Sequence, residues 1–244
     1  MEERGRVSFS VQSPTAAELS ARVLEAEGLD WNLPGTLVWG QQAKHFQMAF
    51  KRVLDVIVSS ILLIFFAVPL AIVAIAVKLD SAGPVLYPHE RVGHHGRRFR
   101  MYKFRSMYVD AEKAKQGLFA ENETDAPLFK LRNDPRRTRV GRIIRRFSID
   151  EFPQLINVLQ GRMSLVGPRP SLPEEAAQFN DFHAHRVVAV PGMTGLWQVS
   201  GRSLIPFEKM VELDVKYARE WSIWLDIFIL IKTIPVILGG RGAY

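Results

Sequence analysis

The sequence contains no cysteine. This excludes disulfide bonds, zinc sites built on thiolates and catalysis by a cysteine nucleophile, and it fits a reducing compartment. The first ten residues, MEERGRVSFS, lack the apolar core typical of a signal peptide, so we expect no cleaved secretion leader. Acidic residues are the minority, with 25 Asp and Glu against 32 Lys and Arg. The resulting net charge of +7 favours an anionic partner: nucleic acid, a phospholipid surface or a phosphorylated substrate.

Charge is also missing from one long stretch, residues 56–77. A straight helix of that length is about 33 Å long, just enough to cross a hydrocarbon core of about 30 Å. Pro69 lies near its middle, where it removes a backbone donor and kinks a helix. Basic residues flank the stretch on both sides, whereas a spanning helix favours them on one side. We therefore predict a re-entrant membrane helix over residues 50–79 that bends at Pro69, with a single-pass helix as the alternative.

The rest of the chain divides around this segment. Residues 1–49 form an N-terminal extension, with a helix start in capping-box register at Thr15 and Glu18. Residues 80–244 contain short extended pieces around ERVG and YKFRSM, then helical stretches. The apolar run 222–238 is interrupted by charge and is either an interfacial helix, with Trp221 and Trp224 at headgroup level, or a buried terminal helix. We expect a mainly helical α+β fold.

Two adjacent acids, Asp150 and Glu151, stand in FSIDEFPQL directly after the basic run RVGRIIRR. One interpretation is a helix cap, since Ser148 and Glu151 match a capping box. The other is a phosphate-handling site. Phosphoryl transfer needs a nucleophile, a divalent cation and positive groups around the phosphate oxygens. One carboxylate can be the nucleophile and its neighbour can hold Mg²⁺.

Arginines near the acids are candidates for binding the phosphate. Arg145 and Arg146 precede them, and Arg169 follows between two prolines that fix its backbone. The other cations in 130–146 are typical of a solvated or lipid-facing surface. In the loop GMTGLWQVSGR, Gln198 and Arg202 are candidate substrate contacts, although a tight connecting loop explains the glycines equally well. HHG at 94–96 is interpreted as a turn rather than a metal site.

A series of motifs resembles the bacterial sugar transferase family, the monotopic phosphoglycosyl transferases. In chain order they are KRxxD, the proline-broken apolar segment, ERVG, YKFRSM, DPRRTRVGRIIRRFSIDEFPQLINVLQGRMSLVGPRP and PGMTGLWQVSGR. The resemblance runs from about Lys51 to the end of the sequence. It implies a monotopic membrane protein with a small catalytic domain, interfacial amphipathic helices and a helix broken at Pro69.

The resemblance also implies an activity. Members transfer a sugar 1-phosphate from a UDP-sugar to undecaprenyl phosphate, release UMP, and so begin exopolysaccharide, capsule or O-antigen assembly at the cytoplasmic face of the bacterial inner membrane. It implies a ping-pong route in which Asp150 becomes the phosphosugar-bearing nucleophile and Glu151 binds Mg²⁺. Arg169 matches the family's phosphate-binding arginine, and Lys103 matches the basic position of the KFRSM stretch. The implied partners are UDP-sugar, undecaprenyl phosphate and inner-membrane phospholipids, with a homodimer left open and no nucleic acid.

Details of the last segment resemble the hexose-1-phosphate transferases for glucose or galactose. A UDP-N-acetylhexosamine donor is the alternative within the same chemistry. From another class, the chain is a non-catalytic, membrane-anchored protein that binds anions through its basic face. A structural scaffold in polysaccharide assembly is a third interpretation.

Overall fold

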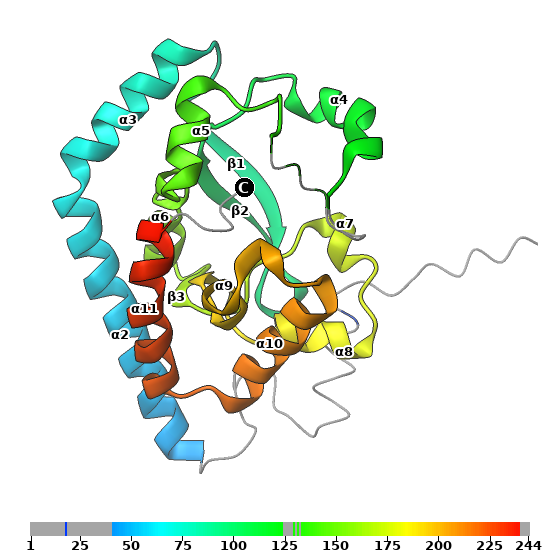
Figure 1. Ribbon diagram of the computed structural model, residues 1–244. Coiled ribbons are helices and arrows are strands. Elements are labelled where there is room, and N and C mark those ends of the chain that lie inside the picture. Colours follow the sequence, from blue (N-terminus) through cyan, green and yellow to red (C-terminus); the bar gives the residue numbers. More distant parts are fainter. Residues whose placement is uncertain (1–17, 19–40, 124–128, 130, 132, 240–244) are drawn as a thin grey trace, which may run out of the picture.

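The computed structural model describes residue 18, residues 41–123, 129, 131 and 133–239. The predicted cap at Thr15 and most of the N-terminal extension therefore lie outside the described residues. Within that range the protein is mainly helical, with two small two-stranded sheets, which confirms the expected α+β class (Figure 1). The α-helices are α2 (Gln41–Phe65), α3 (Ala67–Asp80), α4 (Ala111–Lys115), α5 (Arg139–Arg146), α6 (Gln154–Leu159), α7 (Pro173–Ala176), α8 (Asp181–Ala184), α9 (Leu196–Ser200), α10 (Phe207–Glu220) and α11 (Ile223–Gly239).

Strands and short 3-10 turns connect these helices. The strands are β1 (Leu86–Val92), β2 (Arg98–Phe104), β3 (Ser164–Val166) and β4 (Gly192–Thr194). The 3-10 turns are η1 (His94–Gly96), η2 (Gln116–Glu121), η3 (Ile149–Glu151), η4 (His185–Val187) and η5 (Arg202–Leu204). Strands β1 and β2 form an antiparallel hairpin, whose turn is η1, so the prediction of a turn at HHG is confirmed. Strands β3 and β4 pair in parallel.

The apolar segment forms two helices rather than one. Helices α2 and α3 meet at Phe66 with a bend of 65° (Figure 1). The position follows from Pro69, because a proline has no N–H for the carbonyl four residues earlier, at Phe65, and its ring crowds that carbonyl. Among the described residues no single helix is both long and apolar enough to cross a membrane, whereas the bent pair passes that test together.

Helix α2 has one polar and one apolar side. Asp55 is buried and accepts a hydrogen bond from the Leu165 amide at 2.9 Å, and Arg52 donates to Val158 and Leu159 carbonyls at 2.5 and 2.8 Å. These two side chains dock α2 onto β3 and onto the carboxyl end of α6. The opposite side of the helix pair exposes large apolar side chains along its whole length: Val53, Ile57, Ile61, Ile64, Phe65, Val68, Ile72, Ile75 and Leu79.

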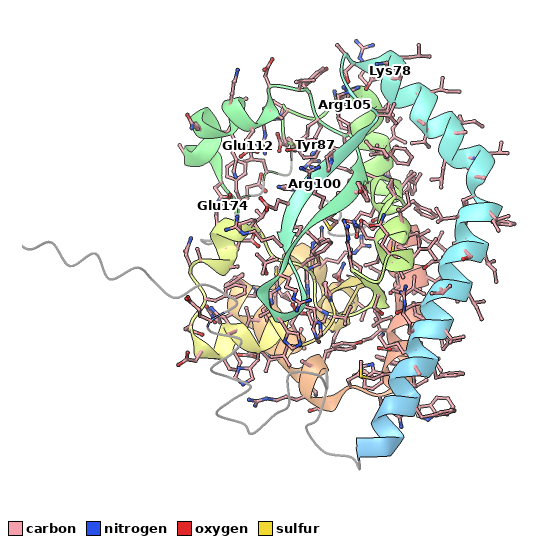
Figure 2. All side chains as sticks on the ribbon, turned by 180° about the vertical axis from the view of Figure 1, so that it is seen from behind. Lys78, Tyr87, Arg100, Arg105, Glu112 and Glu174 are labelled. Atoms are coloured by element: carbon pink, nitrogen blue, oxygen red, sulfur yellow. The ribbon has the colours of Figure 1, made fainter. Side chains whose placement is uncertain are left out.

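The far end of α3 is held by polar contacts as well. Arg105 is buried and donates to the backbone carbonyls of Ala82, of Ser81 at 2.7 Å and of Val77 at 3.1 Å. The last carbonyls of a helix lack partners within it, so this guanidinium caps α3. Figure 2 shows Arg105 at the end of β2, beside the last turn of α3 that carries Lys78.

Helix α11 has one buried face and one exposed apolar face. Asp226 and Ile229 are buried, while Trp224, Phe228 and Ile231 are exposed. The two sequence interpretations, a buried terminal helix and an interfacial helix, therefore each describe one face. Trp221 is half-buried and its indole N–H donates to the Asp226 carboxylate at 3.1 Å, whereas Trp224 is exposed. Its place at headgroup level stays a prediction.

Asp226 joins three elements. It accepts hydrogen bonds from Lys51 on α2 at 2.5 Å, from Tyr217 on α10 at 2.7 Å and from Trp221. Lys51 and Tyr217 also donate to the carbonyl of Val166, at 3.0 and 3.1 Å. This junction fixes the end of β3, and Arg169 follows three residues later.

We expect Asp226→Ala to lower the free energy of unfolding by about 3–5 kcal/mol, because it removes the carboxylate that pairs with the largely buried Lys51 ammonium and accepts from Tyr217 and Trp221. Equilibrium denaturation in detergent measures this. The matched control is Glu212→Ala, which removes an exposed partner of Lys209 and should change stability by no more than about 0.5 kcal/mol. Equal losses in the two variants would contradict the role given to the junction.

Candidate active site

The acid pair lies in η3, directly before α6, and α6 is clamped to β2 by one amide side chain. Asn157 is fully buried. Its Oδ1 accepts from the Tyr102 amide at 2.9 Å, and its Nδ2 donates to the Arg100 carbonyl at 2.7 Å. A side-chain amide that satisfies both backbone groups of a strand fixes distance and orientation together. Asn157 thereby sets Lys103, the next residue on β2, at a defined distance from η3.

Helix α5 is fitted to the strand end that follows Lys103. A side chain at Gly141 would bring a Cβ within 2.0 Å of the Ser106 carbonyl oxygen, so only glycine allows this contact. Thr138 caps the helix by accepting from the Gly141 amide at 2.9 Å. Arg145 on the same helix donates to the Ser106 hydroxyl at 3.0 Å. The KFRSM segment therefore carries Lys103 and anchors the helix that leads to the acids.

The capping interpretation of the acid pair was wrong. Ser148 has a positive φ of 55°, a left-handed conformation rare for a residue other than glycine, and makes no capping hydrogen bond. Pro153, rather than Ser148, immediately precedes α6, also without a side-chain cap. The strained turn frees both carboxylates from helix capping, and such strain is typical of functional sites.

Glu151 is held between two cations from different elements. Lys103 donates to its Oε1 at 2.7 Å and Arg169 to the same atom at 2.9 Å. Asp150 is buried, and no hydrogen bond from a described residue reaches its carboxylate. The structure thus brings together four predicted residues, Asp150, Glu151, Lys103 and Arg169, and gives the two acids different surroundings.

The two acids consequently titrate in opposite directions. Burial raises the pKa of Asp150, against the opposing charges of Lys103 and Arg145. Burial would raise the pKa of Glu151 too, but Arg169 and then Lys103 overcome it and hold that pKa well below its usual range. Glu151 is therefore a firmly ionised acceptor, and Asp150 is a carboxylate whose charge the folded protein disfavours.

The loop that carries Arg169 is packed backbone to backbone against β4. A Cβ at Gly192 would lie 2.0 Å from the Gly167 amide nitrogen, and one at Gly195 would lie 2.4 Å from the Gly167 carbonyl oxygen. The glycines of the GMTG motif are thus required by this close approach. A tight connecting loop accounts for them, as the simpler sequence interpretation had it.

The remaining predicted contacts are placed less centrally. Arg202 has a strained φ of 53°, and burial lowers its pKa, against the charge of Glu151. Arg145 acts on Asp150 through its charge. Arg146 is exposed, with its guanidinium over the Phe147 ring, and the structure does not bring it to the acids. Gln198 donates to the Met193 carbonyl within its own loop at 3.0 Å.

Two groups at the site were not among the predicted site residues. Arg91 and His89 lie on β1, and the charges of Arg169 and Lys103 reach them. Their alternation with Tyr87 in a strand was the available signal, because residues two apart share a face of a sheet. Asn157 was missed as well, since only the packing of α6 on β2 shows what its amide does.

The carboxylates fit a magnesium ion only together with a substrate. Within the described residues no group of three or more His, Cys, Asp or Glu side chains could hold a metal. Two adjacent carboxylates are nevertheless a suitable oxygen set, because Mg²⁺ usually takes one or two carboxylates and completes its shell with water and substrate phosphates. Oε1 of Glu151 receives both cations, so its Oε2 is the available donor.

The site combines two adjacent carboxylates, one of them buried, with Lys103 and Arg169 bound to the second and with Arg91 and Arg202 acting on it through their charge. Acids and cations in this arrangement suit a phosphorylated ligand. The chain belongs to the bacterial sugar transferase family, whose profile matches residues 46–240. This confirms the resemblance seen in the motifs and makes the protein a transferase by family.

Three relatives illustrate the similarity. "Undecaprenyl-phosphate galactose phosphotransferase" of Salmonella typhimurium is 46% identical over 209 residues, which cover 83% of this chain and 43% of the relative. "UDP-glucose:undecaprenyl-phosphate glucose-1-phosphate transferase" of Klebsiella pneumoniae is 38% identical over 234 residues, 93% of this chain and 47% of the relative. "Exopolysaccharide production protein ExoY" of Rhizobium meliloti is 38% identical over 198 residues, 80% of this chain and 88% of the relative. The chain thus spans less than half the length of the first two.

Proposed function

We propose that the protein transfers a hexose 1-phosphate, glucose or galactose, from a UDP-sugar to undecaprenyl phosphate and releases UMP. The carrying observation is the acid pair: one buried carboxylate without a hydrogen-bond partner among the described residues beside a second held by Lys103 and Arg169. The names of the galactose and glucose relatives supply the acceptor and the sugars. The exopolysaccharide relative supports a place at the first membrane step of glycan assembly.

In the proposed mechanism an Asp150 oxygen attacks the β-phosphorus of the UDP-sugar. The bond from that phosphorus to the bridging oxygen breaks, and UMP leaves with the oxygen and the electron pair. Asp150 then carries the sugar phosphate as an acyl phosphodiester. An oxygen of undecaprenyl phosphate attacks the same phosphorus, breaks the Asp150–phosphorus bond and restores the carboxylate.

The surrounding groups have separate tasks in this route. Arg169 and Lys103 are positive groups beside the acids and stabilise charge that develops on the phosphoryl oxygens. Mg²⁺, held by Glu151 and the substrate phosphates, would neutralise the diphosphate and its leaving oxygen. Burial of Asp150 removes the water shell that would weaken it as a nucleophile.

We further propose that α2 and α3 form a re-entrant hairpin in the bacterial inner membrane, with residues 80–244 on the cytoplasmic face. The support is that one body holds both ends. Lys51, near the start of the pair, binds Val166, and Arg105 caps the end of α3 at Ser81. The two ends of the α2–α3 pair contact the same folded domain, so they lie on the same side of a bilayer. The exposed apolar side of the pair suits lipid.

Two further helices extend the proposed lipid-facing surface. Helix α11 exposes Trp224 and Phe228, an aromatic pair suited to the headgroup region. Helix α5, which packs on α3, exposes Arg139, Arg142 and Arg146, which suit the phosphates of anionic phospholipids.

The topology predicts a labelling pattern, and the absence of native cysteine makes it clean to read. Single cysteines at Phe46 and Ala82, both exposed, are expected to react with a membrane-impermeant maleimide from the cytoplasmic side only. A cysteine at Phe65, exposed at the bend, should be protected from both sides by lipid. Reaction of positions 46 and 82 from opposite sides would establish a spanning pair and refute the re-entrant hairpin.

The activity is tested by mixing purified protein with undecaprenyl phosphate, Mg²⁺ and one UDP-sugar at a time. UMP release and the formation of lipid-linked product are measured. Transfer from UDP-glucose or UDP-galactose is the expected result. Transfer only from a UDP-N-acetylhexosamine would replace the donor and keep the chemistry. Salt-sensitive lipid binding without any UMP release would instead identify an anion-binding protein.

A further inference from the structure

Arg91 is half-buried and makes no salt bridge with a described residue. Lys103 and Arg169 contact Glu151, whereas the carboxylates of Glu175, Glu151 and Glu174 act on Arg91 through their charge alone. A guanidinium with unused donors beside the acid pair suits an anionic ligand.

The register of the β1–β2 hairpin places Arg91 on the face that carries the site. Tyr87 lies opposite Lys103 and His89 opposite the buried Met101, and Arg91 follows in the same alternating row. The outer face instead carries Glu90, which pairs loosely with Arg98 at 3.8 Å in solvent. Arg91 thus shares the inner face of the hairpin with Lys103.

Two hydrogen bonds orient the Arg91 guanidinium. Nη1 donates to the Pro170 carbonyl at 3.3 Å, and Nη2 bonds to Nδ1 of His89 at 3.3 Å. Pro170 is the residue after Arg169, so the two arginines are tied to one stretch of backbone. The Nε atom is buried and has no partner among the described residues. Arginine has five N–H donors, so donors remain for a ligand.

His89 orients Arg91 without neutralising it. Burial, and then the charge of Arg91, lower the pKa of His89 to about 3, so the ring is neutral at pH 7 and its Nδ1 acts as acceptor. Burial, and then the charge of Arg169, lower the pKa of Arg91 to about 10, which leaves it protonated at pH 7. A carboxylate in place of His89 would form an ion pair with Arg91 and neutralise it within the protein. The neutral imidazole leaves the positive charge of Arg91 available to an anionic ligand.

We propose that Arg91 is a second phosphate-binding arginine, which binds the phosphate that leaves with the nucleotide while Arg169 binds the one under attack. This rests on the proposed function. Arg169 contacts Glu151, next to the nucleophile, and so lies at the reacting phosphorus. The Arg91 guanidinium reaches in from β1 and is held by the carbonyl of Pro170, the residue after Arg169, so it suits the second phosphate of a diphosphate.

The test is titration calorimetry with UMP, and separately with inorganic pyrophosphate, in Mg²⁺-containing buffer. Arg91→Gln should weaken UMP binding about ten- to a hundredfold, the range for losing hydrogen bonds to a charged group. Arg91→Lys should recover part of the affinity, because it restores charge but not the planar fork. The control is Arg100→Gln, an exposed residue on the same hairpin, which should bind UMP like the unaltered protein.

Kinetics separate binding from a merely structural role. If Arg91 binds the leaving phosphate, Arg91→Gln raises KM for the UDP-sugar more than it lowers kcat, whereas Arg169→Gln mainly lowers kcat. The proposal would be overturned if Arg91→Gln bound UMP as tightly as Arg100→Gln does. It would also be overturned if Arg91→Gln lost UMP affinity only together with a lower melting temperature. If the unaltered protein failed to transfer sugar phosphate, only the proposed function would be refuted. Pyrophosphate binding, which needs no turnover, would still show whether Arg91 binds phosphate.

Discussion

Asp150→Asn is expected to abolish sugar-phosphate transfer, by at least about 10³-fold in kcat, while leaving the folded protein as stable as before or more stable. The activity is lost because an amide cannot attack phosphorus to form the acyl phosphodiester. Stability is kept because no described residue donates a hydrogen bond to this carboxylate. UMP release and thermal unfolding, measured on the same preparation, provide the two readings.

The sign of the stability effect follows from the direction of the Asp150 pKa. A carboxyl group whose pKa is raised on folding destabilises the protein once the pH exceeds that pKa, because the folded state then holds a charge it disfavours. The neutral asparagine removes this cost near pH 7. The extra stability of Asp150→Asn over the unaltered protein should become smaller as the pH falls toward about 3.8, the usual pKa of aspartate. A clearly destabilised Asp150→Asn protein would contradict the account of Asp150.

Glu151→Gln is expected to lower both the rate and the stability. Glutamine leaves Lys103 and Arg169 close together without their shared carboxylate, which costs about 1–3 kcal/mol in a partly buried network. The variant should also need more Mg²⁺ for half-maximal rate, because it replaces a charged oxygen ligand by a neutral one. Denaturation and a magnesium titration of UMP release measure the two effects.

The pH dependence of the Glu151 effect runs opposite to that of Asp150. A carboxylate whose pKa is lowered on folding stabilises the protein above its unfolded pKa, and that stability is lost as the pH falls through the folded value. The difference in free energy of unfolding between the unaltered protein and Glu151→Gln should therefore be constant near neutral pH and become smaller below about pH 4.5. Glu220→Gln, which alters an exposed carboxylate near Lys216, is the control and should show no such difference. If Glu151→Gln were as stable as this control, Glu151 would not be the stabilising partner that Lys103 and Arg169 share.

Motif spacing was sufficient to predict much of the site. Asp150, Glu151 and Arg169 were predicted from the residues themselves and Lys103 from the family resemblance, and the structure brings the four together from η3, the loop after β3, and β2. The break near Pro69 was also predictable, because it follows from the missing backbone donor of a single residue. In both cases local chemistry decides the outcome.

Features that depend on packing could not be predicted. The capping box was expected at Ser148 because its pattern is local, but a left-handed turn lies there, between α5, which packs on Ser106 after β2, and α6, which packs on β2. Arg145 and Arg146 are indistinguishable in sequence, yet the helix turns one toward Ser106 and leaves the other exposed. The contributions of Asn157 and Arg91 exist only once β1, β2 and α6 have assembled.

The central claim, that Asp150 carries the sugar phosphate, is tested most directly by intact-protein mass spectrometry. Detergent-purified protein is mixed with Mg²⁺ and a single UDP-sugar, without lipid acceptor. The account predicts an added mass of one hexose phosphate that disappears when undecaprenyl phosphate is supplied and never forms in Asp150→Asn. Normal UMP release on addition of the acceptor, with no adduct from any donor beforehand, would contradict it and establish direct transfer between the two substrates.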